Sequence, residues 1–125
     1  MRRYRYIILS EESTFVHDVK NHVQGLGLLY CGSAASMNDG VNLVISELPD
    51  LIFLQPSGED RRSALSLSLL TELQHYLRFL PKVILAAEST AIAVEALRYD
   101  VLAFIHLPAQ RVDFVKAVMK FDRCC

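Results

Sequence analysis

The sequence predicts a doubly wound α/β domain built on a parallel five-stranded sheet. Short apolar runs typical of strands alternate five times with stretches whose apolar residues recur every three or four positions, the spacing of one helix face. Glycine or proline marks several boundaries between these segments. The third run is apolar at four consecutive positions, which is typical of a strand buried on both faces of a parallel sheet.

The first strand is predicted over 4–9, where aromatic and β-branched residues are frequent. The helix that follows is expected to stop at Gly25 and Gly27, because glycine tolerates the left-handed backbone of a helix end. Its buried stripe consists of Val16, Val19, Val23 and Leu26. The second strand is predicted over 28–31 and is closed by Gly32.

Ser36 is predicted to cap the second helix, with Asp39 three residues on as a weak capping partner. Pro49 ends this helix because proline cannot continue it. A third strand over 50–54 and a polar loop over 55–62 follow. The buried stripe of the second helix is predicted to be Val41, Val44, Ile45 and Leu48.

The third helix is expected to run up to Pro81, with an apolar stripe of Leu65, Leu69, Leu73, Tyr76 and Leu80. A fourth strand over 82–87 precedes a fourth helix over 90–98, whose inward residues are predicted to be Ile92, Ala93, Ala96 and Leu97. The fifth strand is predicted over 101–107 and the fifth helix over 111–121, with the stripe Phe114, Val115, Val118 and Met119.

Such alternation implies right-handed crossovers that place helices on both faces of the sheet. Five strands fit the order 2-1-3-4-5, so the expected architecture is a flavodoxin-like (βα)5 three-layer sandwich. A length of 125 residues leaves room for one domain, predicted over 1–125. Hydrophobic residues make up 52% of the chain, which is enough for a core and argues against disorder.

Charge and composition exclude several functional classes. With 13 basic and 14 acidic residues the net charge is −1, which argues against a nucleic-acid-binding surface over the whole domain. No apolar run approaches the ~20 residues of a membrane span, and the short run after the basic start is too short for a signal peptide. We therefore expect no membrane contact and a cytoplasmic location. The cysteines lack zinc-site spacing, and they are Cys31, Cys124 and Cys125.

In doubly wound sheets the working site lies at the carboxyl ends of the strands, where the strand order reverses. The residues predicted at these ends follow the first, third, fourth and fifth strands. They are Ser10, Glu11, Glu12, Gln55, Pro56, Ala86, Ala87, Glu88, His106, Leu107 and Pro108.

One of these positions carries a family resemblance. The run Pro-Asp-Leu-Ile-Phe-Leu-Gln, residues 49–55, resembles the signature Pro-Asp-Leu-Ile-Phe-Leu-Asp of CheY-like response-regulator receivers, with Gln55 in place of the last aspartate. The stretch 91–120 is similar to the matching region of receivers of the LytR/AlgR class, in which the receiver usually precedes a DNA-binding domain. The resemblance covers essentially the whole chain. It implies a two-component signalling domain that meets nucleic acid only through a domain not present in this chain.

The resemblance assigns the chemical positions of a receiver one by one. The acidic pair after the first strand maps to Ser10 and Glu11, and the phosphoryl-accepting aspartate maps to Gln55. The hydroxyl residue that contacts the phosphoryl group maps to Ala86, and the phosphate-binding lysine maps to Leu107. A carboxamide is a poor nucleophile, and alanine and leucine offer no donor. We therefore expect a degenerate site without phosphorylation at Gln55.

Two further positions follow from the same resemblance. The switch aromatic maps to Phe104, which keeps a ring but lacks a phenol. The proline after the lysine maps to Pro108, and in this family the preceding peptide is typically cis. Glu11 and Glu12 with one backbone carbonyl would make only a weak site, so we expect Mg²⁺ binding to be weak or absent, and we predict no other cofactor or metal.

Two functions remain open, and neither is an enzyme. In the first, the chain is a pseudo-receiver that acts by protein contact or dimerisation, as the regulatory domain of a transcription regulator. The contact face would comprise the fourth helix, fifth strand and fifth helix, with Ala93, Leu97, Phe104, His106 and Arg111. In the second, a small ligand fills the emptied acidic pocket. An enzyme of the same topology is the weakest reading, because it needs a phosphate loop where the sequence has Ser10, Glu11 and Glu12.

Overall fold

A computed structural model describes residues 3–57 and 65–124 of the chain. Its elements alternate between strand and helix in the predicted order, and all strand pairs are parallel with the sheet order β2-β1-β3-β4-β5. The strands are β1 (Tyr4–Leu9), β2 (Leu28–Ala34), β3 (Leu51–Leu54), β4 (Lys82–Ala87) and β5 (Ala103–His106). The helices are α1 (Ser13–His22), α2 (Met37–Glu47), α3 (Ser68–Leu73), α4 (Thr90–Glu95), the 3₁₀ turn η1 (Ala96–Arg98) and α5 (Arg111–Cys124). The predicted fold class is confirmed.

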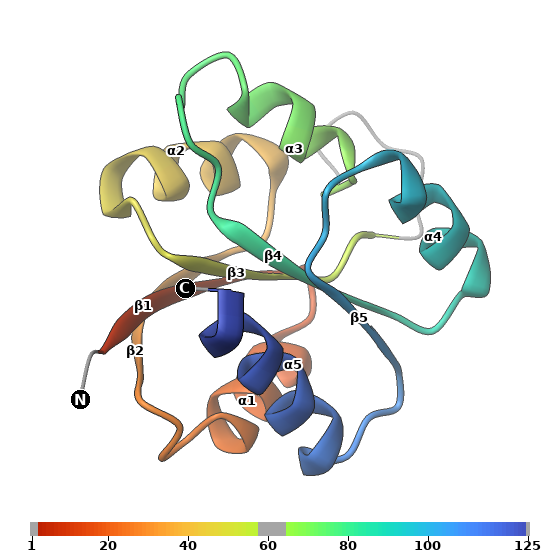
Figure 1. Cartoon of the computed structure of the whole chain (residues 1–125). Coiled ribbons are helices and arrows are strands. Elements are labelled where there is room, and N and C mark those ends of the chain that lie inside the picture. The colour runs from red at the N-terminus through yellow and green to blue at the C-terminus, as the bar shows by residue number, and fades with distance from the viewer. Residues whose placement is uncertain (1–2, 58–64, 125) are drawn as a thin grey trace.

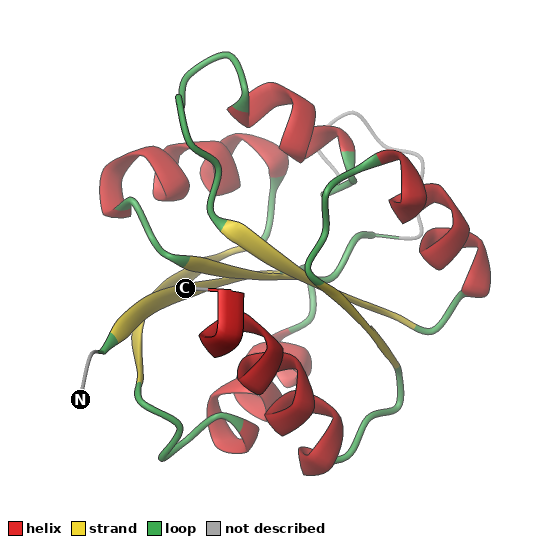
Figure 2. Ribbon diagram, viewed as in Figure 1, coloured by secondary structure: helices red, strands yellow, loops and turns green. Residues whose placement is uncertain are grey.

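The sheet is the middle layer of the sandwich. Helices α1 and α5 cover one face, and α2, α3 and α4 cover the other (Figures 1 and 2). Each face has its own apolar cluster, one built around Ile8, Phe53 and Phe114 and the other around Ile7, Leu54 and Leu69. All four residues of β3 are fully buried, as predicted for a strand with helices on both sides.

The second strand is longer than predicted. It continues through Gly32 to Ala34, and the pairing with β1 shifts so that Cys31 and Gly32 together oppose Ile7. This is a β-bulge, in which one strand contributes an extra residue. Gly32 has φ +136°, and a Cβ there would lie 3.2 Å from Leu43. The glycine therefore permits a bulge rather than ending the strand.

The third helix is shorter than predicted. Among the described residues it spans only Ser68–Leu73, and the chain then leaves helical conformation in a series of turns. Leu65, Leu69 and Leu73 are buried as predicted, but Tyr76 and Leu80 are exposed. Apolar residues continue to recur every three or four positions after the helix has ended at Leu73. The prediction that Tyr76 and Leu80 belong to its buried stripe was therefore wrong.

Smaller corrections concern helix faces and ends. β5 is shorter than 101–107, and α5 extends beyond Phe121 to Cys124. Four residues predicted to be inward are exposed at the edges of their helices, namely Ile45, Leu48, Leu97 and Met119. In α5, Ala117 and Phe121 are buried instead, next to the correctly predicted Phe114 and Val118. No helix within 3–57 or 65–124 has the length and apolarity needed to cross a bilayer.

Candidate functional site

The carboxyl ends of β1 and β3 meet at a direct side-chain contact. Ser10, the residue after β1, is 3% exposed, and its hydroxyl donates a 2.5 Å hydrogen bond to Oε1 of Gln55. Gln55 is the residue after β3, and its backbone N–H donates to the carbonyl of Leu9 at 2.9 Å. The two strands therefore extend their pairing into the loops, which brings these two side chains together.

Glu12 completes this hydrogen-bonded group. Its backbone N–H donates to the hydroxyl oxygen of Ser10 at 2.9 Å, and its Oε2 accepts a 3.4 Å hydrogen bond from Nε2 of Gln55. Both polar ends of the Gln55 carboxamide are thus engaged, one by a hydroxyl and one by a carboxylate. The residues Ser10, Gln55 and Glu12 therefore form one connected hydrogen-bonded group.

The neighbouring strand ends contribute apolar side chains. Ala86, near the end of β4, is 1% exposed and belongs to the cluster under α1 and α5. Leu107 follows β5, packs against the same cluster, and donates its backbone N–H to the carbonyl of Ala87 at 2.9 Å. The Leu107–Pro108 peptide is cis. Phe104 is partly buried and packs against the cluster on the opposite face of the sheet.

A cleft of about 190 Å³ opens beside Gln55. Apolar side chains of Leu107, Pro108 and Phe114 line it together with three carboxylates, which belong to Glu12, Asp18 and Glu88. His22 also lines the cleft, and its ring stacks on Phe114 with 5.0 Å between centroids. This cleft is therefore small, and it combines exposed carboxylates with the more deeply buried apolar side chains of Leu107 and Phe114.

Sequence reasoning did not place the α1 residues of this cleft. Thr14, Asp18 and His22 line it at intervals of four residues, which puts them on one ridge of the helix. That spacing is visible in the sequence and could have identified them. The predicted site residue Glu11 does not line this cleft: it is exposed and lines a second hollow, together with Ser10, His17 and Lys20.

The side chains at these strand ends do not fit Mg²⁺. This ion takes oxygen ligands in near-ideal octahedral geometry, commonly one or two carboxylates with waters. Here the Ser10 hydroxyl donates to the Gln55 carboxamide oxygen, and the Glu12 carboxylate accepts a hydrogen bond from the Gln55 amide nitrogen. Within 3–57 and 65–124 no three histidine, cysteine or acidic side chains are grouped as metal ligands.

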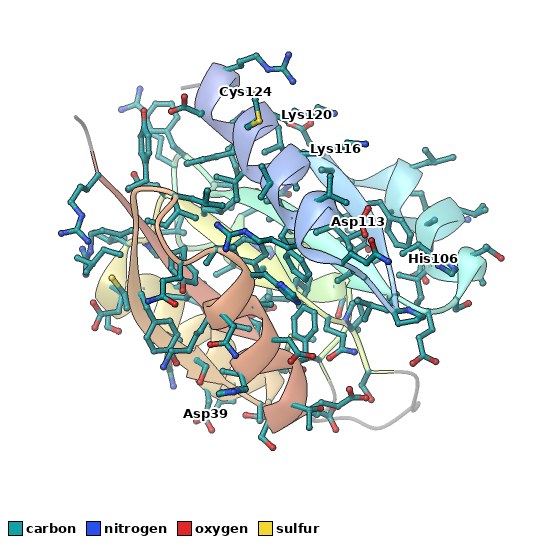
Figure 3. The ribbon with its side chains drawn as sticks, turned by 90° about the horizontal axis from the view of Figure 1, so that it is seen from below. Asp39, His106, Asp113, Lys116, Lys120 and Cys124 are labelled. Atoms are coloured by element: carbon teal, nitrogen blue, oxygen red, sulfur yellow. The ribbon has the colours of Figure 1, made fainter. Side chains whose placement is uncertain are left out.

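The residues predicted for the contact face are all at least partly exposed. Leu97 in η1 is 84% exposed, His106 is exposed, and Ala93 and Phe104 are partly exposed. A hollow of about 390 Å³ lies between β5 and α5, with Phe104 and His106 on one side. On its other side stand Asp113, Lys116 and Lys120, which follow one another along the β5 side of α5 (Figure 3). Arg111 differs, because its guanidinium donates to the carbonyl of Gln24 after α1 at 3.4 Å.

The fold is that of a class of solved structures, the receiver domains of response regulators. The response regulatory domain of protein mrkE from Klebsiella pneumoniae is similar at a TM-score of 0.82, with 16% identity and 96% of each chain covered. A LuxR-family two-component response regulator from Aurantimonas sp. SI85-9A1 has a TM-score of 0.78 at 10% identity, with 94% of this chain and 83% of that chain covered.

RcsB from Salmonella typhimurium, a response regulator studied for its DNA interaction, is similar at a TM-score of 0.84 and 13% identity. The match covers 98% of this chain, which spans 62% of the RcsB chain. The sequence itself matches no protein-family model and no curated protein. These likenesses establish the receiver fold.

Proposed function

We propose that this chain is a pseudo-receiver, a signalling domain of receiver fold that is not phosphorylated at Gln55 and acts through protein contacts. The observation that carries the proposal is the closed Ser10–Gln55–Glu12 hydrogen-bond group beside Ala86 and Leu107. A phosphoryl group needs a nucleophilic acceptor and donors that stabilise its charge. The carboxamide offers no such nucleophile, and the two flanking side chains offer no donor.

The substitutions are mutually consistent. With Gln55 in place of an aspartate, a phosphate-binding lysine at position 107 would have no phosphate to bind, and Leu107 packs instead against the apolar cluster under α1 and α5. The proposal therefore treats the site as a structural element, in a domain over 1–125 that has no enzymatic activity.

The output surface that we propose is the face formed by α4, η1, β5 and α5. It combines exposed apolar side chains, Val94 and Leu97, with the charged hollow between β5 and α5. An exposed apolar patch bordered by charge is typical of a protein contact. One of the similar solved structures is the response regulator RcsB in complex with DNA. By analogy we propose that this chain is the regulatory domain of a cytoplasmic transcription regulator and acts through a protein partner or as a homodimer.

Ligand binding in the emptied pocket is the second candidate. Its support is the mixed acidic and apolar lining of the cleft beside Gln55. Its volume of about 190 Å³ counts against it, because small-molecule sites commonly occupy ~300–1,000 Å³. We therefore rank contact signalling first.

Two measurements on the wild-type chain test the proposal. Addition of beryllofluoride with Mg²⁺ should leave the amide spectrum at Gln55, Ala86 and Leu107 unchanged. Light scattering should show self-association or partner binding that Leu97→Asp weakens and that Leu29→Asp, on the opposite edge strand β2, does not. Chemical-shift changes at the three site positions on stoichiometric beryllofluoride would overturn the pseudo-receiver assignment.

A further inference from the structure

A second surface, away from the contact face proposed above, has the form of a docking groove. It runs between α2 and α3 and has a volume of about 760 Å³. Its apolar lining comes from Met37, Val41 and Ile45 of α2 and from Tyr76 after α3. Its polar lining is made of amide and hydroxyl side chains and one carboxylate, namely Asn38, Asn42, Ser68, Thr71 and Glu72.

Exposed apolar residues are frequent on the side of the molecule that carries this groove, and two of them, Ile45 and Tyr76, line it. Of the ten large hydrophobic side chains exposed in the described ranges, five lie on α2, at its end, or between α3 and β4. They are Ile45, Leu48, Tyr76, Phe79 and Leu80. Figure 1 shows the connection from α3 to β4 on the same side of the sheet as α2. Soluble proteins seldom leave such a group uncovered unless it binds something.

Leu48 is the clearest case. It ends α2 with φ +47°, the only positive φ of a non-glycine residue in the described chain. Glycine or asparagine is favoured at such a position, so a leucine there carries a conformational cost. Its side chain is 61% exposed, so core packing does not compensate this cost.

The charge of this side of the molecule indicates the partner. Residues 32–57 and 65–80 contain four carboxylates and one arginine, Arg78, whose guanidinium lies over the Phe79 ring, and the intervening segment 58–64 adds no net charge. Glu47 is paired with Arg5 at 2.6 Å, whereas Glu72 lines the groove itself. A basic partner is favoured here because opposite charges at the edge of an interface speed association and reject acidic competitors.

We propose that the groove between α2 and α3 binds an amphipathic helix of a partner protein, one that carries lysine or arginine beside its apolar face. The apolar residues of such a helix, spaced i, i+3/i+4 and i+7, would lie on Met37, Val41, Ile45 and Tyr76. A basic side chain at the edge would pair with Glu72. Asn38, Asn42 and Thr71 supply hydrogen bonds along the polar lining.

The test uses two synthetic peptides of about 14 residues, roughly 20 Å of helix. Both carry leucine at the i, i+3, i+4 and i+7 spacing; one has lysine at the flanking positions and its twin has glutamate. Fluorescence anisotropy at low salt should show the lysine peptide binding at least ~10-fold more tightly than its twin. The difference should shrink at ~1 M salt. Amide shifts should centre on Asn38, Asn42 and Tyr76.

Variants on both sides of the molecule sharpen the test. Ile45→Ser should weaken binding of the lysine peptide at least ~10-fold. Glu72→Lys should reverse the preference, so that the glutamate peptide binds more tightly than the lysine peptide. Leu97→Ser on the other surface is the matched control and should leave binding unchanged. Thermal unfolding followed by circular dichroism checks that each variant remains folded.

Three outcomes would overturn the proposal. These are equal or absent binding of the two peptides, amide shifts that centre on α4, β5 and α5, and self-association of the chain that Ile45→Ser abolishes. The last result would assign the groove to a second copy of the chain. None of them bears on phosphorylation at Gln55, so the two proposals fail independently.

Discussion

Ser10 and Gln55 are joined by a 2.5 Å hydrogen bond across the carboxyl ends of two adjacent strands, β1 and β3. A serine hydroxyl needs an acceptor when it is buried, and the Gln55 carbonyl oxygen provides it. In a receiver these two positions are the ones assigned to metal binding and phosphoryl transfer. Here they bind each other, so the loop after β3 is attached to β1 by its own side chains.

This relationship makes Ser10 a stability residue. Ser10→Ala removes the donor to Gln55 and the acceptor for the backbone N–H of Glu12. We expect the free energy of unfolding to fall by roughly 1–3 kcal/mol, because polar groups lose their partners in a buried site. Urea unfolding measures the change. Ser46→Ala, at an exposed hydroxyl on α2, is the control and should stay within about 0.5 kcal/mol. An equal effect of both changes would contradict the structural role.

The buried Tyr6 phenol should make the stability of the domain depend on pH in the alkaline range. Burial raises the pKa of the Tyr6 phenol to about 12, with smaller contributions from Tyr30 and Cys31. Because the unfolded chain loses this proton near its ordinary pKa of ~10, the unfolded state gains stability above that pH. Stability should be unaffected by this group below pH ~10 and should fall as the pH rises toward about 12.

Ultraviolet titration measures this ionisation directly. The wild type should show one tyrosine that ionises near pH 12, and Tyr6→Phe should remove that step. The Tyr6→Phe variant should also lose less stability than the wild type between pH 10 and 12. Ionisation of all tyrosines together near pH 10 would show that Tyr6 is not buried as described.

Two phenylalanines differ sharply in burial and allow a core position to be compared with a surface position. Phe53 is fully buried in β3, between Tyr6 and Phe114, whereas Phe79 after α3 is 81% exposed. Phe53→Ala should destabilise the domain by about 3–5 kcal/mol through the cavity that it leaves. Phe79→Ala should change stability by no more than about 0.5 kcal/mol. A large loss on Phe79→Ala would mean that α3 continues past Leu73 and buries this ring.

The strands were predictable because their signals are local. The apolar run of β3 and the alternation of five strand-like and helix-like segments were sufficient to predict the sheet order, which the structure confirms. The extent of α3 was not predictable, because its apolar spacing continues through Tyr76 and Leu80 although the helix stops at Leu73. Spacing indicates which residues would share a face of a helix; it does not indicate where the tertiary structure ends that helix.

The candidate site was predictable in part. The strand ends that gather Ser10, Gln55, Ala86 and Leu107 follow from the topology alone. Which of two adjacent glutamates turns toward Gln55 does not, because it depends on how the loop enters α1. In the structure the Glu12 carboxylate accepts a hydrogen bond from Gln55, whereas Glu11 lines a different hollow. The role of the site remains a prediction that chemistry on the protein must test.

The most direct test of the central claim is intact mass spectrometry after incubation with acetyl phosphate and Mg²⁺. We compare the wild type, Gln55→Asp, and the triple variant Gln55→Asp/Ala86→Thr/Leu107→Lys. We predict no phosphoryl adduct on the wild type and none at ordinary receiver rates on Gln55→Asp, because Ala86 and Leu107 still provide no donor. The triple variant carries all three groups and shows whether they are sufficient for phosphorylation. A stoichiometric, acid-labile phosphoryl adduct on the wild type, or its rapid formation on Gln55→Asp alone, would contradict the pseudo-receiver account.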